Sequence, residues 1–405
     1  NLFNISIYNV LAQIMTLESG KPIRESYGEV TYGTSFLDYY AEEAIRPTSA
    51  GGGFITPSPF ESTANGSPRG KIMAIHEAVG VTAMITPWNF PLAMITRKVG
   101  PALAVGCTSI LKPSELTPLT AIAMKTLALR AGIPDHVFQL IISDKANTPL
   151  IGTELCTNKM IRKISFTGST SVGKLLMKEI SNNVNRLSLE LGGNAPFIVF
   201  DDADIDQAVD AAIASKFRNA GQTCICADRF ILHTSIEKEF IAKLCKQLST
   251  FLIGSGMNDV TTMGPLITES AAIGIKKKVD EAIADGAERI YGGSHLNELG
   301  PNFFTPTVLN NVSVLSRIWR EETFGPVIAI ARFSREDEAI ELANDTAYGL
   351  ASYFCTKNLE RVFRVASRLD NGIVGINDGI ISTATAPFGG TKESGLGREG
   401  SAMGI

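Results

Sequence analysis

The sequence predicts an α/β protein with two parallel-sheet domains and a small protruding element. Its 405 residues exceed what one hydrophobic core usually holds. From residue 80 onward, short β-branched runs alternate with amphipathic stretches, the order typical of βαβ units. The strands read as continuous apolar runs, which indicates parallel sheets covered by helices on both faces.

The first series of elements predicts one parallel sheet. A helical pattern over residues 11–18 precedes it. The expected helices lie at 92–104, at 117–131 and from 168 onward, with a short helix before the strand at 162–166. The expected strands are 81–85, 108–112, 137–142, 162–166 and 186–191.

The second series predicts a second α/β domain of the same kind. We expect its strands at 195–200, 229–233, 326–333, 350–355 and 373–376. The helical patterns between them cover 204–217, 236–250, 270–285, 335–344 and 358–368.

A segment rich in Gly, Pro, Ser and Thr, residues 47–70, separates the opening helices from the first series. Lys71–Ile75 then alternates like an exposed strand or hairpin. We expect a protruding element that pairs with another subunit. The chain opens at Asn1 inside a helical pattern and stops at Ile405, so we also expect a truncation at both ends.

Composition excludes several classes of protein. A net charge of −4 gives no basic footprint, so nucleic acid and anionic membranes are unexpected partners. No apolar run reaches membrane-spanning length, and no secretory signal opens the chain. Six cysteines in so long a chain form no disulfide framework. These observations favour a cytoplasmic protein, with mitochondria as the alternative if a targeting segment is missing.

The stretch Phe217–Cys226 presents a candidate nucleophile. Cys224 follows Gly221-Gln-Thr, where the backbone can bend sharply and no bulky residue shields the sulfur. By itself this loop is compatible with a protease nucleophile, a redox pair with Cys226, or buried packing. Only four histidines occur, none in a cysteine-containing motif, so a Cys-His arrangement has no evident base. No metal site is expected either.

Two turns suit a dinucleotide. Gly168-Ser-Thr-Ser-Val-Gly173 follows a strand and opens a helix, where free N–H groups and the helix dipole hold phosphate. Lys112-Pro-Ser-Glu115 follows another strand end, where open parallel sheets place ligands. Each alone is as compatible with an ordinary turn; together they favour a cofactor site.

Two further residues have side chains suited to chemistry on a carbonyl group. Asn89 lies in the rigid stretch Thr86–Pro91, and its amide is suited to stabilising an oxyanion, although capping the next helix is a common alternative. Glu190 ends an apolar strand before Gly192-Gly193, and partial burial favours a general base, although a solvated carboxylate is the commoner fate.

Seven ordered motifs resemble the aldehyde dehydrogenase superfamily over essentially the whole chain. They are Pro87–Pro91, Lys112–Glu115, Phe166–Thr170, Leu189–Gly193, Phe217–Cys224, Glu321–Pro326 and Pro387–Lys392. The resemblance implies an aldehyde-dehydrogenase-like α/β fold. Its cofactor domain would be 1–59 and 79–191, its catalytic domain 192–391, its oligomerisation hairpin 60–78, and 392–405 would return to the oligomerisation region.

The resemblance also implies roles for individual residues. Cys224 attacks the aldehyde, Asn89 and the Cys224 backbone N–H hold the oxyanion, and Glu190 activates the water that hydrolyses the thioester. The cofactor is NAD or NADP, and Glu115 leans toward NAD because a carboxylate repels the extra phosphate of NADP. The implied cofactor-binding residues are Thr86, Trp88, Lys112, Ser114, Glu115, Gly168, Ser169, Leu191, Glu322 and Phe324.

Within the superfamily, the sequence is most similar to succinate-semialdehyde dehydrogenases of 4-aminobutyrate degradation. In that subfamily two arginines and a serine hold the substrate carboxylate, and Arg97, Arg218 and Ser382 match them. The alternatives are another aldehyde, such as glutarate semialdehyde or an uncharged one, or a non-catalytic truncated homologue. A homodimer or homotetramer is implied.

Cys226 matches a second cysteine found in redox-sensitive members of that subfamily. The hypothesis is that a strained Cys224–Cys226 disulfide blocks the nucleophile under oxidation.

Overall fold

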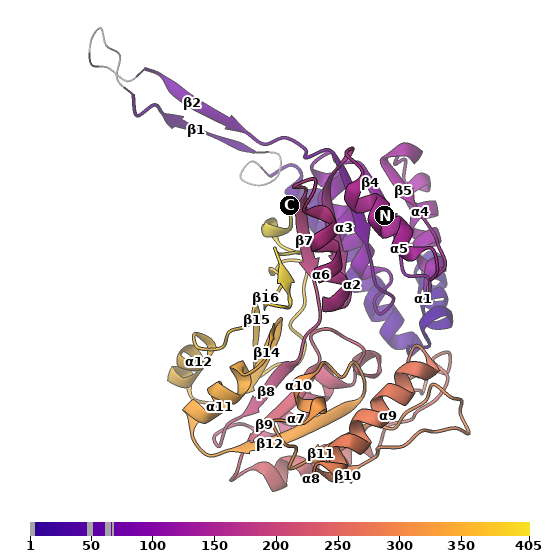
Figure 1. Ribbon diagram of the computed structural model, residues 1–405, viewed down its shortest axis with the longest axis vertical. Coiled ribbons are helices and arrows are strands. Elements are labelled where there is room, and N and C mark those ends of the chain that lie inside the picture. The colour runs from indigo at the N-terminus through magenta and orange to yellow at the C-terminus, as the bar shows by residue number, and fades with distance from the viewer. Residues whose placement is uncertain (1–4, 47–51, 61–65, 67–68) are drawn as a thin grey trace.

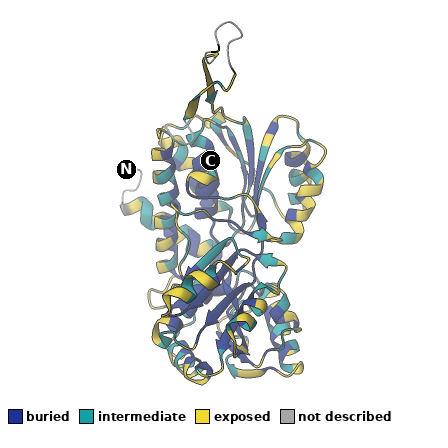
Figure 2. Ribbon diagram, turned by 90° about the vertical axis from the view of Figure 1, so that its left-hand side faces the viewer, coloured by how far each residue is buried: buried dark blue, intermediate teal, exposed yellow. Residues whose placement is uncertain are grey.

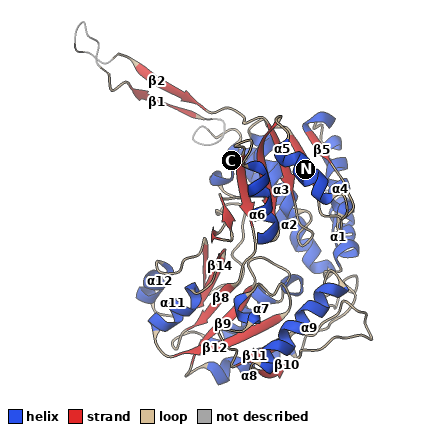
Figure 3. Cartoon of the chain, viewed as in Figure 1, coloured by secondary structure: helices blue, strands red, loops and turns tan. Residues whose placement is uncertain are grey.

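The computed structural model describes residues 5–46, 52–60, 66 and 69–405. Two α/β domains are stacked along the long axis, and a two-stranded hairpin projects from one end (Figure 1). Helices lie on both faces of each sheet (Figure 3), so the strands are the most buried parts of the molecule (Figure 2). This arrangement confirms the predicted fold class. No helix in the described ranges is long and apolar enough to cross a membrane.

The first domain is built on a six-stranded sheet in the order β17-β7-β6-β3-β4-β5. All neighbours are parallel except β17, which is antiparallel to β7. Its strands are β3 (Val81–Ile85), β4 (Ser109–Lys112), β5 (Phe138–Leu140), β6 (Ile161–Thr167), β7 (Arg186–Glu190) and β17 (Gly395–Leu396). Its helices are α1 (Ile5–Ser19), α2 (Ile23–Glu43), α3 (Ala93–Ala104), α4 (Pro118–Arg130), α5 (Thr148–Thr157) and α6 (Thr170–Ile180), and the 3₁₀ turn η1 (Asp135–Val137) precedes β5.

The register of this sheet brings the predicted turns to one edge. Ile85 of β3 lies opposite Lys112 of β4 and Phe166 of β6, and Thr167 lies opposite Glu190 of β7. The carboxyl ends of four parallel strands therefore meet, which is where open α/β sheets place their ligands.

The second domain contains a seven-stranded sheet in the order β10-β11-β12-β9-β8-β14-β15, in which only the β10–β11 pair is antiparallel. Its strands are β8 (Ala195–Val199), β9 (Ala227–His233), β10 (Glu288–Tyr291), β11 (Thr307–Asn310), β12 (Val327–Phe333), β14 (Ala351–Cys355) and β15 (Ile373–Ile376). Its helices are α7 (Ile205–Lys216), α8 (Glu237–Leu248), α9 (Glu269–Ala284), α10 (Arg317–Arg320), α11 (Glu336–Asn344) and α12 (Leu359–Ala366). The largest hydrophobic core surrounds this sheet.

Sequence patterns did not predict β10 and β11. Each strand has four residues, and β10 is a partly exposed edge strand that carries Glu288 and Arg289. So short a run shows no clear periodicity. The two strands extend the sheet beyond the five strands that the sequence predicts for this domain.

The protruding element is an antiparallel hairpin of β1 (Gly53–Pro57) and β2 (Lys71–Ile75). Its first strand lies before the boundary expected at residue 60. Part of the segment 47–70 falls outside the described residues. The hairpin exposes large apolar side chains, among them Phe54, Ile55 and Met73.

The C-terminal segment crosses back from the second domain to the first (Figure 1). A short sheet of β13 (Tyr348–Gly349) and β16 (Thr391–Lys392) begins the crossing. β17 then adds to the edge of the first sheet, with Gly395 opposite Glu190. The chain ends in the 3₁₀ turn η3 (Ala402–Gly404) near the base of the hairpin. This path carries Glu399 into the interior of the first domain.

Candidate active site

Most of the predicted site residues meet in one pocket of about 240 Å³, to which both domains contribute. The β3–α3 loop, the beginning of α6 and the turn after β7 form the side of the first domain. The Cys224 loop and the segment around Phe324 form the opposite side. The predicted residues that line it are Trp88, Asn89, Arg97, Gly168, Ser169, Leu191, Arg218, Cys224, Glu322, Phe324 and Ser382.

A left-handed turn presents Cys224 to the pocket. Asn219, Ala220 and Gly221 have φ of 52°, 53° and 77°. A side chain at Gly221 is excluded, because its Cβ would lie 2.2 Å from the carbonyl oxygen of Gly325. Similarly, a Cβ at Gly193 would lie 2.1 Å from the Cys224 carbonyl oxygen. Both glycines therefore allow backbone segments to pack closely behind the thiol.

Burial raises the pKa of the Cys224 thiol to about 12, and the positive charge of Arg97 opposes this shift. The thiol is therefore protonated near neutral pH in the ligand-free protein. A nucleophilic thiolate at this position requires a nearby base or a change in the surroundings of the sulfur.

Asn89 presents an oriented amide to the same pocket. Its Oδ1 accepts a hydrogen bond from the Phe90 N–H at 3.1 Å, and its Nδ2 donates to the Gln222 carbonyl at 3.1 Å. An Asn amide has two N–H donors, so among the described residues one of them has no other acceptor. The geometry leaves this donor for a ligand oxygen.

Glu190 does not line the pocket; it lies buried beside it at the end of β7. Neither carboxylate oxygen has a hydrogen-bond partner among the described residues. Burial, followed by the negative charge of Glu399, raises the pKa of Glu190 well above its usual range, and Arg97 and Lys98 oppose the shift. A carboxyl group with a raised pKa is suited to accept a proton near neutral pH.

Arg97 is already paired within the protein. Its Nε lies 2.6 Å from Glu399 Oε2, its guanidinium stacks 4.2 Å from the centre of the Phe388 ring, and its Nη2 contacts Met94 Sδ at 3.1 Å. Its Nη1 is buried and has no hydrogen-bond partner in the described part of the chain. Arg97 can thus offer a ligand one donor, although most of its charge is compensated.

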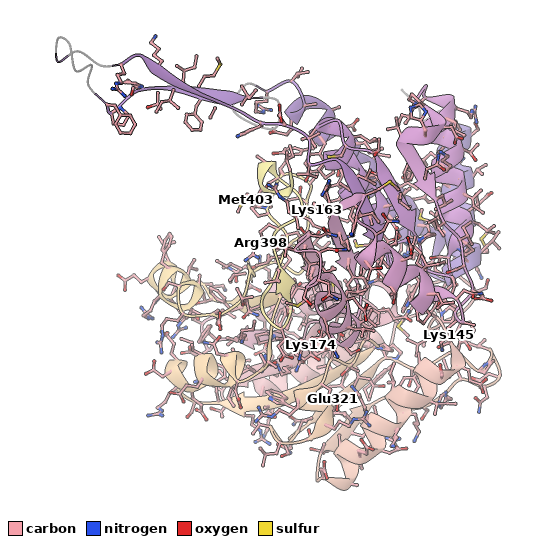
Figure 4. All side chains as sticks on the ribbon, turned by 45° about the horizontal axis from the view of Figure 1, so that its top comes forward. Lys145, Lys163, Lys174, Glu321, Arg398 and Met403 are labelled. Atoms are coloured by element: carbon pink, nitrogen blue, oxygen red, sulfur yellow. The ribbon has the colours of Figure 1, made fainter. Side chains whose placement is uncertain are left out.

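Lys98 and Glu399 belong to this network, and sequence reasoning did not find them. Lys98 Nζ forms an ion pair with Glu399 and donates to Ser165 Oγ at 2.9 Å. The two residues are 301 positions apart, so no local motif could reveal the pair. With Arg97 they also line a second cavity of about 600 Å³, together with Lys163 and Arg398 (Figure 4).

Arg218 differs from Arg97 because no ion pair to it occurs among the described residues. It lines the pocket with its guanidinium 5.1 Å from the centre of the Phe90 ring. Ser382 lies in the same pocket and is hydrogen-bonded to the hydroxyl of Tyr32. Tyr32 was missed by sequence reasoning because it is one of many residues within α2 and carries no motif.

Four predicted cofactor residues lie at the sheet edge outside this pocket. Lys112 Nζ lies 3.6 Å from Glu115 Oε2 and donates to the Pro113 carbonyl at 3.0 Å. Burial lowers the pKa of Lys112. Ser114 Oγ accepts from the Leu116 N–H at 3.2 Å, and the Thr86 N–H donates to the Lys112 carbonyl at 3.1 Å.

The groups at this edge fit a dinucleotide. The hydroxyl of Thr86 is buried without a hydrogen-bond partner among the described residues. Ser169 is the N-cap of α6, accepting from the Val172 N–H at 3.4 Å, so the positive end of the helix dipole faces the pocket. A Cβ at Gly192 would lie 2.9 Å from Glu322 Oε2, so the lack of a side chain at Gly192 keeps the space between its backbone and Glu322 open.

Glu322 and Phe324 form the wall opposite α6. Glu322 Oε1 accepts from the Gly193 N–H at 3.0 Å, and burial raises the pKa of Glu322 to about 8. Phe324 meets Trp88 edge to face, with ring centres 5.6 Å apart. The two rings close one side of the pocket.

Cys226 faces away from the pocket. It is buried, and its Sγ donates to the Lys216 carbonyl at 3.5 Å. Both Cys224 and Cys226 are free thiols. The hypothetical disulfide between them therefore requires the loop to rearrange.

The fold and the pocket together define an oxidoreductase of the α/β class. The family model for the aldehyde dehydrogenase family matches residues 8–405, and the chain belongs to that family, which confirms the resemblance. The chain is 48% identical to the NADP(+) succinate-semialdehyde dehydrogenase of Escherichia coli over 408 residues, covering 100% of this chain and 81% of the relative. It is likewise 48% identical to a glutarate-semialdehyde dehydrogenase of Pseudomonas putida, covering 98% and 79%.

Two solved structures of aldehyde dehydrogenases resemble this chain. The crystal structure of succinate-semialdehyde dehydrogenase from Burkholderia pseudomallei has a TM-score of 0.94 at 49% identity, covering 99% of this chain and 80% of that one. Betaine aldehyde dehydrogenase from Staphylococcus aureus in complex with NAD+ has a TM-score of 0.91 at 38% identity, covering 98% and 77%.

Proposed function

We propose that the chain oxidises a short aldehyde acid, succinate semialdehyde, to the corresponding dicarboxylic acid with NAD or NADP. The observation that carries this proposal is the convergence in one pocket of the Cys224 thiol, the Asn89 amide and the Arg218 guanidinium, which forms no ion pair among the described residues. The thiol can attack a carbonyl carbon, and the amide can donate a hydrogen bond to the oxyanion that forms. The guanidinium can bind the carboxylate at the other end of the substrate.

In the proposed reaction the Cys224 thiol releases its proton to solvent through the pocket that it lines, and the sulfur then forms a bond to the aldehyde carbon. The carbonyl oxygen becomes an oxyanion held by the Asn89 amide and by the Cys224 N–H. The bound nicotinamide supplies the acceptor for the hydride that leaves the same carbon. The substrate is then a thioester on Cys224.

Glu190 serves hydrolysis of the thioester. A water molecule adds to the thioester carbon while its proton passes to Glu190, and the carbon–sulfur bond breaks to release the acid and the Cys224 thiolate. The raised pKa of Glu190 supports this role, because a base that holds a proton near neutral pH accepts it readily from water.

The cofactor would lie across the carboxyl edge of the first sheet. Lys112, with Ser114 and Glu115, would hold the adenosine ribose, and Gly168 and Ser169 the pyrophosphate region. Thr86 would contact the cofactor at the sheet edge beside Lys112. On the other side, Glu322 and Phe324 would hold the nicotinamide ribose and ring, next to Trp88 and Leu191. The relatives support both cofactors, since one is named for NADP(+) and another was solved with NAD+.

The oligomeric assembly belongs to the proposal as well. The hairpin β1–β2 exposes apolar side chains on two strands, and a lone two-stranded hairpin is marginally stable in water. A homodimer or homotetramer would cover it. The compartment, cytoplasm or mitochondria, stays a prediction.

Steady-state formation of reduced nicotinamide tests the function. We expect turnover with succinate semialdehyde, lower kcat/KM with glutarate semialdehyde, and lower values again with an uncharged aldehyde of equal length. Cys224→Ala should lose about 10⁴-fold or more in kcat, as removal of a covalent nucleophile does, while still binding cofactor. Full turnover of Cys224→Ala, or equal kcat/KM for charged and uncharged aldehydes, would contradict the proposal.

A further inference from the structure

The corner between α1 and α2, residues 20–25, touches both domains. Gly20 makes the turn with φ of 78°. The Ile23 N–H donates to the Gly256 carbonyl at 2.8 Å, and a Cβ on Gly256 would lie 2.3 Å from the Lys21 carbonyl oxygen. The corner is thus packed against the second domain, although α1 and α2 belong to the first.

Lys21 extends from this corner to the loop that carries Asn89. The side chains of Lys21 and Glu29 are 1% and 0% exposed and form an ion pair at 2.6 Å. The same ammonium donates to the Asn89 backbone oxygen at 2.6 Å and lies 4.5 Å from the centre of the Phe90 ring. A buried ammonium is stable only with its acceptors in place, so any displacement of Asn89 breaks a charge-assisted hydrogen bond.

Glu29 fixes the end of the same loop. Its Oε1 accepts from the N–H groups of Leu92 at 2.8 Å and Ala93 at 3.2 Å. Leu92 is the N-cap of α3 and has no side-chain cap of its own, so Glu29 supplies the missing acceptor from another helix. One ion pair therefore holds the loop at Asn89 and at the start of α3.

The nucleophile loop is tied to the same point. Asn219 Nδ2 donates to the Asn89 backbone oxygen at 3.0 Å, beside the Lys21 ammonium. The Asn219 N–H donates to Glu25 Oε2 at 2.8 Å, and Glu25 belongs to the first turn of α2. Because Asn219 and Ala220 have a left-handed backbone, the loop needs such external bonds to keep its shape.

From these contacts we infer that Lys21 and Glu29 are positioning residues that set the Asn89 amide relative to the Cys224 sulfur. This inference rests on the proposed oxyanion role of Asn89. The amide and the thiol come from different domains, and the Asn89 carbonyl accepts hydrogen bonds both from Lys21 in the corner and from Asn219 in the nucleophile loop. Misplacement of reacting groups by about 1 Å can cost about 100-fold in rate.

The test uses the double variant Lys21→Met/Glu29→Gln. It removes both charges together, so no buried charge is left unpaired, and the Gln carbonyl can still accept from Leu92 and Ala93. We expect kcat to fall about 10- to 100-fold, with KM values for aldehyde and cofactor within about threefold of the parent. The control is Lys125→Met/Asp135→Asn, which removes an ion pair of 2.7 Å at the surface of the first domain by the same kind of substitution and should leave kcat unchanged.

A double-mutant cycle with Asn89→Ala separates positioning from general stability. In the Asn89→Ala background the Lys21→Met/Glu29→Gln change should cost less than about twofold in kcat, because the amide it positions is gone. Repetition of the full loss in that background would overturn the inference. Lys21→Arg, which keeps the charge and a donor, should retain more activity than the double variant, and equal loss in both would also overturn it.

The cycle also separates this inference from the proposed function. If Asn89→Ala itself retains the parent kcat, the oxyanion role fails and the inference fails with it. If Asn89→Ala loses activity but Lys21→Met/Glu29→Gln does not, only the positioning role is wrong.

Discussion

At the scale of single residues, burial governs the chemistry of the pocket. It raises the pKa of the Cys224 thiol, of Glu190 and of Glu322, each in a direction that disfavours the charged form. The two arginines of the pocket have different partners. Arg97 forms an ion pair with Glu399, whereas Arg218 lies beside the Phe90 ring. Arginine is therefore an ion-pair partner at position 97, whereas at position 218 it has no ion pair within the described part of the chain.

The substrate carboxylate should depend more on Arg218 than on Arg97. We expect Arg218→Gln to raise KM for succinate semialdehyde about 10- to 100-fold, the value of one or two charge-assisted hydrogen bonds, and to leave KM for an uncharged aldehyde nearly unchanged. Arg97→Gln should instead lower the melting temperature, because among the described residues it leaves the buried Glu399 with Lys98 as its ion-pair partner. Kinetics on both aldehydes and thermal melts check this, and the reverse pattern would show that Arg97 is the main clamp.

Glu322 should make the stability of the protein depend on pH. Its pKa is about 8 in the folded protein and about 4.3 in an unfolded chain, so the folded state binds more protons. Its contribution is fully present below the unfolded value and is lost as pH rises toward 8. We compare the melting temperature of Glu322→Gln with that of the parent. The difference, variant minus parent, should increase from pH 5 to pH 8 and stay level above pH 8. A difference that is constant over that range would contradict the assignment.

At the scale of elements, the ends of strands and the turns that follow them create the site. Gly168-Ser-Thr follows β6, the Trp88–Asn89 loop follows β3, and Glu190 ends β7. Parallel register places all three at one edge. The corner between α1 and α2 then ties this edge to the Cys224 loop through Lys21 and Glu25.

The hairpin should serve assembly rather than chemistry. Ile55 and Met73 lie opposite each other in its register and are 64% and 70% exposed. We expect Ile55→Ser/Met73→Ser to shift the protein to a smaller species in light scattering while the pocket residues stay in place. Leu150→Ser/Met160→Ser, equally exposed positions in the first domain, should leave the mass unchanged. The same mass for the hairpin variant and the parent would refute the assembly role.

At the scale of the whole molecule, two domains meet at one pocket. The second sheet lies in one large hydrophobic cluster, the first sheet is packed by two separate clusters, and the C-terminal segment connects the domains by adding β17 to the first sheet. Ligands that contact both domains should therefore stabilise the whole chain.

Cofactor binding offers a measurement of that coupling. A ligand at 100 times its Kd stabilises the folded state by about 2.7 kcal/mol, so NAD or NADP should raise the melting temperature. The cofactor that gives the larger shift at equal concentration is the preferred one. Cys224→Ala should keep the shift and Lys112→Met should reduce it. No shift with either cofactor at millimolar concentration would contradict a dinucleotide site.

The sequence by itself determined the α/β class, the order of the main strands and helices, and the local motifs around Asn89, Glu190 and Cys224. These follow from periodicity and turn chemistry, which act over a few neighbouring residues. It did not reveal β10 and β11, whose four residues are too few to show a period.

Only the tertiary structure decided which charges are free. Glu399 pairs with Arg97 and Lys98, Tyr32 meets Ser382, and Cys226 turns away from the pocket toward Lys216. Most of these contacts join residues far apart in the chain. Burial and pairing, which decide which of these groups stays available to a ligand, exist only after the chain has folded.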